Sequence, residues 1–361
     1  MARERPVKIV QAPDFAAYSE VIDVRSPAEF AEDHVPGAIN CWVLDDAQRA
    51  EVGTIYKQVS PFEAKKRGAA LVAANIGRWM ATHFADKPRD YRPLVYCWRG
   101  GQRSMSLATV LARVGWEVHV MEGGYKRYRA RVRETLAAIA PRLHLVVLAG
   151  LTGTAKTRLL HALRARGEQV LDLEGLARHR GSLLGHDPAG PQPAQKYFES
   201  LLARELTALD PARPVWVESE SNKIGNLYCP EALWRRMKDA PVVEVTAPLD
   251  ARVAYLLRDY PHFQADPAAL KRRLDHLVAR HGHATVDHWH ALIDAGDWPA
   301  FVADLLTRHY DPSYRRSIAR HARPVLGRVT LPALDEADIA AGAGRLAALL
   351  AETPAEALAA S

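Results

Sequence analysis

The chain has few cysteines, and it lacks long apolar runs and internal repeats. Its three cysteines, Cys41, Cys97 and Cys229, are odd in number and widely spaced, which argues against a disulfide framework. The first residues lack the apolar core of a signal peptide, and no apolar run is long enough to cross a bilayer. We therefore expect a protein without membrane attachment that works in the cytoplasm, where the reducing environment keeps a free thiol intact.

The chain is long and carries a net positive charge. The 361 residues suffice for two or three domains, and a content of 48% hydrophobic and 25% charged residues is ordinary for a globular protein. A formal net charge of +6 is compatible with a polyanionic partner. Residues 251–330 carry 12 Lys or Arg side chains and eight of the 15 histidines, although a solvated helical surface explains much of this pattern.

Strand-like and helical patterns alternate along the chain, which predicts an α/β fold with parallel sheets and functional loops at the carboxyl ends of the strands. We expect a first domain over 14–137 that ends in a basic connector helix, a second domain over 142–330 that becomes mostly helical beyond Asp250, and an Ala-rich helical tail over 331–361. The expected strands are 21–24, 94–97 and 117–121 in the first domain, and 143–149, 169–173, 214–218 and 242–245 in the second.

The most informative segment follows the expected strand 94–97, which ends on Cys97 and leads through a Gly-Gly loop into a helix. Loop N–H groups and the positive end of a helix both favour a thiolate, which is the reactive form of cysteine. Two loop arginines add positive charge, so we predict Cys97, Arg99 and Arg103 as catalytic residues. A buried structural cysteine is the alternative. The rest of the predicted anion loop is Trp98, Gly100, Gly101, Gln102 and Ser104.

Residues 150–157 nearly match the phosphate-binding loop Gly-x-x-x-x-Gly-Lys-Ser/Thr, with a strand before them and a helix after them. In such a loop the N–H groups surround a phosphate, Lys156 adds a charge, and the Thr157 hydroxyl offers a ligand for an optional Mg²⁺. Ala155 replaces the second glycine of the pattern, which favours binding of a diphosphate over nucleotide hydrolysis. A plain glycine turn is the alternative. The predicted phosphate-binding residues are Gly150, Thr152, Gly153, Thr154, Lys156 and Thr157.

Two polar clusters follow other strands of the second domain, where a nucleotide hydrolase places carboxylates that organise a metal. We predict a supporting or metal-organising role for them, with a surface charge cluster as the alternative. Their residues are Asp172, Glu174, Glu218, Glu220 and Lys223. We assign no metal site, because the four histidines between 281 and 290 lack cysteines and are better explained by a basic helical surface.

Taken together, these motifs resemble those of the tRNA 2-selenouridine synthase family, in which a rhodanese domain is fused to a P-loop domain. The likeness runs from about residue 14 to residue 317. The strings that carry it are 23–30, 34–40, 56–58, 60–64, 97–104, 123–126, 171–177, 179–181, 192–196, 218–225 and 310–314. The fold that this resemblance implies is a rhodanese-like parallel-sheet domain followed by a P-loop-type α/β domain with a helical C-terminal region.

The resemblance also implies an enzyme that replaces sulfur by selenium in 2-thiouridine at the tRNA wobble position. Selenophosphate would supply the selenium after S-geranylation of the base by geranyl diphosphate. Cys97 would carry or deliver the selenium as a selenylsulfide, Arg99 and Arg103 would hold the selenophosphate anion, and the 150–157 loop would hold the diphosphate. The partners implied are the anticodon region of tRNA and an enzyme that supplies selenophosphate, with no membrane.

RNA would contact the basic connector helix and the 251–330 region, where Trp289 and Trp298, together with Trp234 outside it, are candidates for base stacking. Most tryptophans at such positions are simply core residues. Other functions remain open on the sequence alone. They are a general rhodanese-type sulfurtransferase with a regulatory nucleotide-binding domain, a small-molecule kinase in which Cys97 is inert, and a tRNA-binding protein without catalysis.

Overall fold

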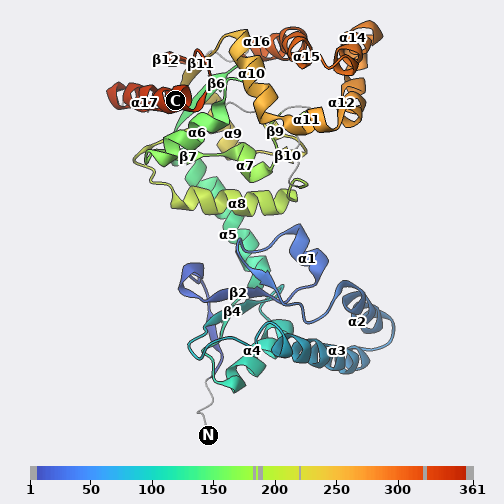
Figure 1. Ribbon diagram of the computed structural model, residues 1–361. Coiled ribbons are helices and arrows are strands. Elements are labelled where there is room, and N and C mark those ends of the chain that lie inside the picture. Colours follow the sequence, from blue (N-terminus) through green and yellow to red (C-terminus); the bar gives the residue numbers. More distant parts are fainter. Residues whose placement is uncertain (1–5, 182–183, 186–189, 219–220, 320–322, 355–361) are drawn as a thin grey trace. The chain divides into compact units, whose positions relative to one another are not determined.

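The computed structural model describes residues 6–181, 184–185, 190–218, 221–319 and 323–354 (Figure 1). They form two compact units, and the chain passes between these units more than once. The first unit comprises the residues up to Thr135 together with Pro193–Arg204, and the second comprises Leu136–Gln192 and the chain from Glu205 onward. Within this described part, no helix has the length and apolar character that crossing a membrane requires.

A five-stranded parallel sheet is the framework of the first unit, with the strand order β1-β5-β4-β2-β3. Its strands are β1 (Lys8–Val10), β2 (Glu20–Asp23), β3 (Ile39–Asn40), β4 (Pro93–Tyr96) and β5 (His119–Met121). The central strand β4 is buried along its whole length, as is typical of a parallel strand that is covered on both faces. The loop that carries Cys97 therefore leaves from the middle of the sheet.

Helices pack around this sheet. They are α1 (Pro27–Glu32), α2 (Asp46–Gln58), α3 (Pro61–Ala81), α4 (Gln102–Val114) and most of α5 (Gly124–Ile139), with a 3-10 turn, η1 (Phe15–Ala17). Helix α4 buries Leu107, Ala108 and Leu111, which recur at helical spacing, and it ends at Gly115 in the left-handed conformation (φ 111°). This buried face fixes the start of α4 beside the end of β4.

The second unit is built on another five-stranded parallel sheet, with the order β12-β11-β6-β8-β7. Its strands are β6 (His144–Gly150), β7 (Gln169–Leu171), β8 (Pro214–Glu218), β11 (Val242–Thr246) and β12 (Val325–Thr330), and a small antiparallel pair is formed by β9 (Lys223–Ile224) and β10 (Leu227–Tyr228). Strand β6 is central and almost wholly buried, and it leads directly into the predicted phosphate loop.

Helices of the second unit fall into two groups. Those near the sheet are η2 (Ala140–Arg142), α6 (Lys156–Ala165), α7 (Leu173–Ala177), the end of α8 (Gln195–Ala208), α9 (Glu231–Asp239), α10 (Leu249–Asp259) and α17 (Glu336–Glu352). A helical region follows α10, with α11 (Pro261–Ala265), α12 (Pro267–Leu274), η3 (Asp275–Leu277), α13 (Val278–His281), α14 (His283–Asp294), α15 (Trp298–Leu305), the π-helical segment η4 (Leu306–Tyr310) and α16 (Asp311–Ala319). This region has a hydrophobic core of its own around Leu274, Trp289 and Phe301.

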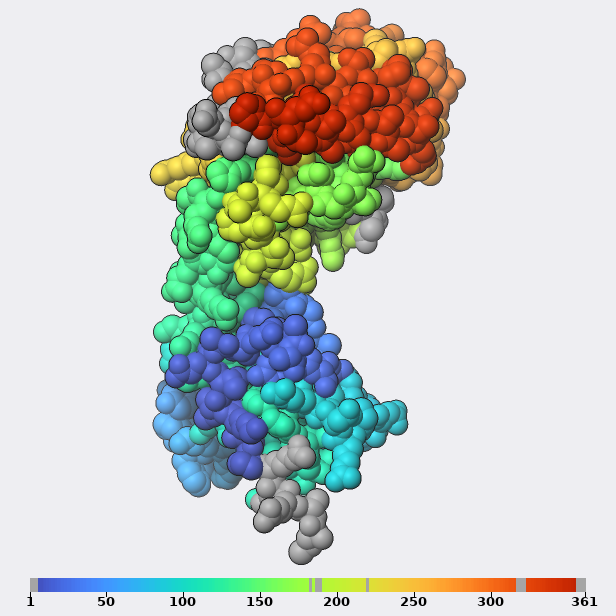
Figure 2. All heavy atoms as spheres, turned by 90° about the vertical axis from the view of Figure 1, so that its left-hand side faces the viewer, coloured from blue at the N-terminus to red at the C-terminus, as the bar shows by residue number. Residues whose placement is uncertain are grey.

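The structure confirms the predicted fold class, but it divides the chain differently in two places. The Ala-rich segment is not a separate tail, because α17 buries Ile339, Ala343 and Leu346 in the core that α6 and the sheet share. The other face of α17 is exposed, and Figure 2 shows it in red as part of the surface of the second unit. Pro193–Arg204 belongs to the first unit, where the Ser200 hydroxyl donates a hydrogen bond to the buried Asp33.

Candidate functional site

Cys97 lies at the first loop position after β4 and is only 4% exposed. Its sulfur accepts a hydrogen bond from the Gly101 N–H at 3.3 Å and lies 3.3 Å from the Ser104 hydroxyl. The Ser104 hydroxyl also donates to the Gly101 carbonyl at 3.0 Å. The sulfur is thus held at the first turn of α4, where N–H dipoles stabilise negative charge. The loop residues Trp98, Arg99, Gly101 and Gln102 are exposed above it.

A second glycine turn clamps this loop through the main chain. The Tyr125 N–H donates to the Cys97 carbonyl at 2.8 Å, and the Lys126 N–H donates to the Trp98 carbonyl at 2.9 Å. Gly124 has a φ of 54°, and a Cβ atom there would lie 2.2 Å from the Cys97 carbonyl oxygen. Only glycine fits so close an approach. The sequence indicated residues 123–126 solely as a matching string, so this clamp was not predicted.

The two predicted loop arginines have different surroundings. The Arg103 guanidinium donates to Glu29 in α1 at 3.0 Å, and Arg49 in α2 approaches the same carboxylate at 3.0 Å. Burial by itself raises the pKa of Glu29, but Arg103 and Arg49 hold it below its ordinary value. Arg99 is exposed and makes no hydrogen bond or ion pair with any residue that the structure describes. Of the two, Arg99 is therefore the cation with its full charge available to an anion.

Beneath the clamp lies a buried polar network that sequence analysis did not predict. Arg25, which is 1% exposed, donates to Asp23 and to the Asp33 carbonyl, both at 2.6 Å. Its guanidinium lies 3.9 Å from the centre of the Tyr125 ring, and the Tyr125 hydroxyl donates to Asp33 at 2.8 Å. Burial raises the pKa of Asp33, against the lowering effect of its hydrogen bonds. The network holds Tyr125, and hence the clamp, in place.

The phosphate loop of the second unit joins β6 to α6. Ala155 precedes the helix in the left-handed conformation (φ 57°), which glycine adopts freely and which costs an alanine about 1–2 kcal/mol. Alanine therefore keeps the backbone shape of the pattern at some cost in strain. The Lys156 ammonium donates to the Gly150 carbonyl at 2.9 Å, and the Thr157 hydroxyl donates to Glu174 at 2.8 Å.

Side chains from distant helices hold this loop, a feature that sequence analysis missed. Arg252 in α10 donates to the Thr152 carbonyl at 2.8 Å and forms a buried two-bond pair with Asp311, at 2.6 and 3.0 Å. The Gly150 N–H donates to the hydroxyl of Tyr314 in α16 at 2.8 Å. These partners lie about a hundred residues or more away in the chain, so no local pattern could pair them.

Carboxylates gather beside Thr157. Glu218 is 1% exposed, and one of its oxygens accepts the Glu174 N–H at 2.6 Å. Its other oxygen has no hydrogen-bond partner among the described residues. Burial, with added repulsion from Glu174 and Asp172, raises the pKa of Glu218 well above its usual range. Asp172 itself caps α7 through the Gly175 N–H at 2.7 Å.

These oxygen atoms fit Mg²⁺, which prefers one or two carboxylates together with substrate phosphates. Thr157, Glu174 and the unpartnered oxygen of Glu218 would hold the ion, which would neutralise charge on a diphosphate. Lys223 packs over the Tyr228 ring at 5.7 Å. Neither Lys223 nor Glu218 is among the residues that line the cleft along the 150–157 loop, whereas Glu174 is. Glu220 lies outside the described residues.

A cleft runs along the phosphate loop and has a strongly basic lining. Its cationic side chains are Lys156, Arg158, Arg180, Arg280 and Arg323. Of the predicted stacking residues, Trp234 lines this cleft and Trp298 lines an apolar cavity. The expectation for Trp289 is wrong, because its ring is fully buried in the helical core and its N–H donates to Asp304 at 2.8 Å. It cannot reach a base.

Comparison with known proteins identifies both units. Residues 143–336 match the model of the tRNA 2-selenouridine synthase AAA domain, and residues 8–131 match the rhodanese-like domain. A tRNA 2-selenouridine synthase of Chromohalobacter salexigens is 35% identical over 84% of this chain and 90% of its own length. Another, from Shewanella halifaxensis, is 31% identical over 85% of this chain and 90% of its own length. The match to one from Nitrosomonas europaea, at 37% identity, covers 68% of this chain and 64% of that protein.

Proposed function

The chain belongs to the tRNA 2-selenouridine synthase family, and we propose that it replaces the sulfur of 2-thiouridine in tRNA by selenium, using one site in each unit. The observation that supports the proposal is the presence of two unlike loops: one in which the Cys97 sulfur accepts the Gly101 N–H, and one bordered by a cleft with a cationic lining. A simple sulfurtransferase has a use for the first site alone, and a kinase has a use for the second alone.

The first step is assigned to the phosphate loop, with geranyl diphosphate as co-substrate. The sulfur of 2-thiouridine attacks the first carbon of the geranyl group, so that an S–C bond forms and the C–O bond to diphosphate breaks. Diphosphate leaves with the electron pair, and the proton on the base is lost to solvent. Lys156 and the loop N–H groups stabilise the leaving anion. Ala155 keeps the left-handed backbone conformation of the loop, which is all that this role requires of residue 155.

The second step is assigned to the Cys97 loop, with selenophosphate as selenium donor. Selenium forms a bond to C2 of the base, the C2–S bond breaks, and the geranylthiol leaves with a proton. Water then cleaves the Se–P bond and releases phosphate. Arg99 and the loop N–H groups hold the selenophosphate anion beside Cys97. A selenylsulfide on Cys97 additionally needs a two-electron oxidant, and mass spectrometry of the intact protein after incubation with selenophosphate detects or excludes this form.

The tRNA itself is assigned to the basic side chains. The exposed arginines of α5 and those lining the phosphate cleft suit a phosphate backbone, and Trp234 in that cleft suits an unstacked base. The binding of tRNA should therefore weaken steeply as salt concentration rises.

Nucleoside mass spectrometry tests the proposal directly. Purified protein is incubated with thiolated tRNA and with geranyl diphosphate, selenophosphate or both, and the tRNA is then digested to nucleosides. We expect S-geranyl-2-thiouridine with the first reagent alone, no product with the second alone, and 2-selenouridine with both. Selenouridine formed without geranyl diphosphate, or an unchanged nucleoside composition under all conditions, would contradict the proposal.

A further inference from the structure

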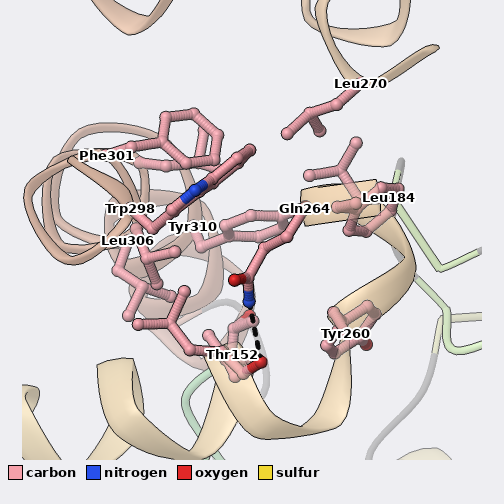
Figure 3. Close-up of a pocket in the computed structure, with 14 residues that line it drawn as sticks. Thr152, Leu184, Tyr260, Gln264, Leu270, Trp298, Phe301, Leu306 and Tyr310 are labelled. Atoms are coloured by element: carbon pink, nitrogen blue, oxygen red, sulfur yellow. Dashed lines mark hydrogen bonds between the residues drawn. The ribbon is translucent and has the colours of Figure 1, made fainter. Parts of the chain in front are cut away.

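An apolar cavity lies in the second unit, next to the phosphate cleft (Figure 3). It lies among α10, α11, α12, α15 and η4, and its cavity volume is about 70 Å³. Rings and branched side chains dominate its walls. The residues that define it are Leu257, Phe263, Leu270, Trp298, Phe301 and Leu306.

Polar groups are few in this cavity, and those present are partly used. The Gln264 amide donates to the Leu257 carbonyl at 3.1 Å, which Figure 3 marks as a dashed line. The remaining polar groups on the lining side chains are the hydroxyls of Thr152, Tyr260 and Tyr310 and the indole N–H of Trp298. Protein interiors rarely leave such space unfilled, and hollow apolar sites with few polar groups are typical of ligand pockets.

The cavity adjoins the cleft that runs along the phosphate loop, because the two share lining residues. Thr152, Leu256, Tyr260 and Tyr310 line both the cavity and the cleft that contains Lys156 and Thr157. Thr152 belongs to the loop itself, and its carbonyl is fixed by Arg252 at 2.8 Å. A single ligand can thus place an anionic group on the loop and an apolar group in the cavity.

We propose that this cavity holds the hydrocarbon chain of an isoprenoid diphosphate whose diphosphate group lies on the 150–157 loop. The inference rests on the proposed function and adds to it the residues that recognise the prenyl chain. A nucleotide base is a poorer occupant, because its polar edges would lose their hydrogen bonds to water and find few partners among these side chains. An isoprenoid chain has no polar edge to satisfy.

Binding measurements on the full chain separate this inference from the proposed function. Calorimetry with geranyl diphosphate and with inorganic diphosphate should show tighter binding of the former, by about a hundredfold, because burial of the chain adds hydrophobic free energy. Equal affinities for the two compounds would overturn the cavity assignment and leave the phosphate loop intact. Binding of neither compound would overturn the role of the loop as well.

A matched pair of variants in α10 locates the chain. Leu257 lines the cavity, whereas Ala254 lies one turn earlier on the same helix and is exposed. Leu257→Trp fills the cavity and should weaken geranyl diphosphate binding by about tenfold or more, while inorganic diphosphate binds as before. Ala254→Trp should change neither affinity. An unchanged affinity of Leu257→Trp for geranyl diphosphate would place the chain elsewhere.

Photolabelling keeps the inference open to refutation if Leu257→Trp does not fold. A prenyl diphosphate with a diazirine at the far end of its chain is bound to the unmodified protein, irradiated and digested. We expect label on peptides of α11, α15 or η4, and loss of this label in the presence of excess geranyl diphosphate. Labelling confined to other peptides would overturn the inference.

Discussion

The two candidate loops occupy equivalent places in their units, but they are held in different ways. Each leaves the central strand of a five-stranded parallel sheet and meets the first turn of a helix. In the first unit the loop is clamped by main-chain bonds from the turn at Gly124. In the second unit it is held by side chains, through Arg252 and Tyr314.

This difference determines how each loop can fail. A main-chain clamp depends on close approach, so that any side chain in place of the glycine disrupts it. A side-chain clamp depends on buried charges that must remain paired. Loss of one partner leaves the other charge buried without compensation, which destabilises the fold by its full desolvation penalty. The five substitutions below test this contrast, together with the separation of the two chemical steps.

The largest effect is expected from Cys97→Ser in the first unit. Selenium incorporation should fall to background, because the loop loses the soft sulfur atom beside which it holds selenophosphate. Geranylation should persist, since the phosphate loop belongs to the second unit. Nucleoside mass spectrometry measures both products in one reaction. Loss of both activities together, in a variant that still folds, would contradict the separation of the two steps.

The next largest effect is expected from Asp311→Ala, which leaves Arg252 buried without its partner. Unfolding free energy of the second unit should fall by about 3–5 kcal/mol, and geranyl diphosphate binding should weaken because Arg252 holds Thr152. Urea unfolding followed by tryptophan fluorescence measures the loss. The control is Glu244→Ala, which removes an exposed pair with Arg328 and should cost less than about 1 kcal/mol. Equal losses in the two variants would refute the side-chain clamp.

Lys156→Ala should weaken geranyl diphosphate binding by about 10–100-fold, because it removes a charged hydrogen-bond donor to the diphosphate. Selenium transfer to a base that is already geranylated should be unaffected. Arg166→Ala, just beyond the end of α6, removes the same charge outside the loop and serves as the control for calorimetry. If the affinity of Lys156→Ala is the same as that of the control, the loop does not bind the diphosphate.

Gly124→Ala tests the main-chain clamp. It should lower the unfolding free energy of the first unit by about 1–3 kcal/mol, because residue 124 is in the left-handed conformation and its new Cβ atom would clash with the Cys97 carbonyl oxygen. Selenium incorporation should fall while geranylation is retained. Gly53→Ala in α2 has open space around its Cβ position and should be neutral or slightly stabilising. Thermal unfolding and nucleoside analysis compare the two variants. A harmless Gly124→Ala would show that the clamp is not needed.

The smallest effect is expected from Glu218→Gln. Because the pKa of Glu218 is raised on folding, its contribution to stability is complete below the ordinary carboxyl pKa and is lost as pH rises toward the folded-state value. Wild-type stability should therefore decline with pH in that window, by up to about 1.4 kcal/mol per pH unit, relative to the glutamine variant. Urea unfolding of both proteins across this pH range measures the difference. Parallel pH profiles would contradict the raised pKa.

Local patterns predicted the parts of the molecule that depend on neighbouring residues. Short segments of sequence suffice to predict three features: the position of Cys97 after a buried strand, the N–H donor in its loop, and the start of a helix at Lys156–Thr157. The partners of each loop do not. Nothing near Cys97 indicates that Gly124 approaches its carbonyl, and nothing near Thr152 indicates Arg252, because these contacts depend on how the whole sheet is assembled.

Domain boundaries were harder to predict for the same reason. An Ala-rich segment near the end of a chain is typical of a loosely attached helix, but α17 presents Ile339 and Leu346 to a core that accepts them. Segment 193–204 is joined to the second domain in sequence, yet Ser200 and Arg129 tie it to the first unit, through bonds from Ser200 to Asp33 and from Arg129 to Glu199. Local periodicity carries no information about such exchanges.

The most direct test of the account is to bypass the first step. The Lys156→Ala variant is given tRNA that already carries S-geranyl-2-thiouridine, together with selenophosphate, and its nucleosides are analysed by mass spectrometry. The account predicts 2-selenouridine at the wild-type rate, because the variant lacks only the site for the prenyl donor. Failure to form 2-selenouridine from this substrate, in a variant that folds normally, would contradict the division of the two steps between the two units.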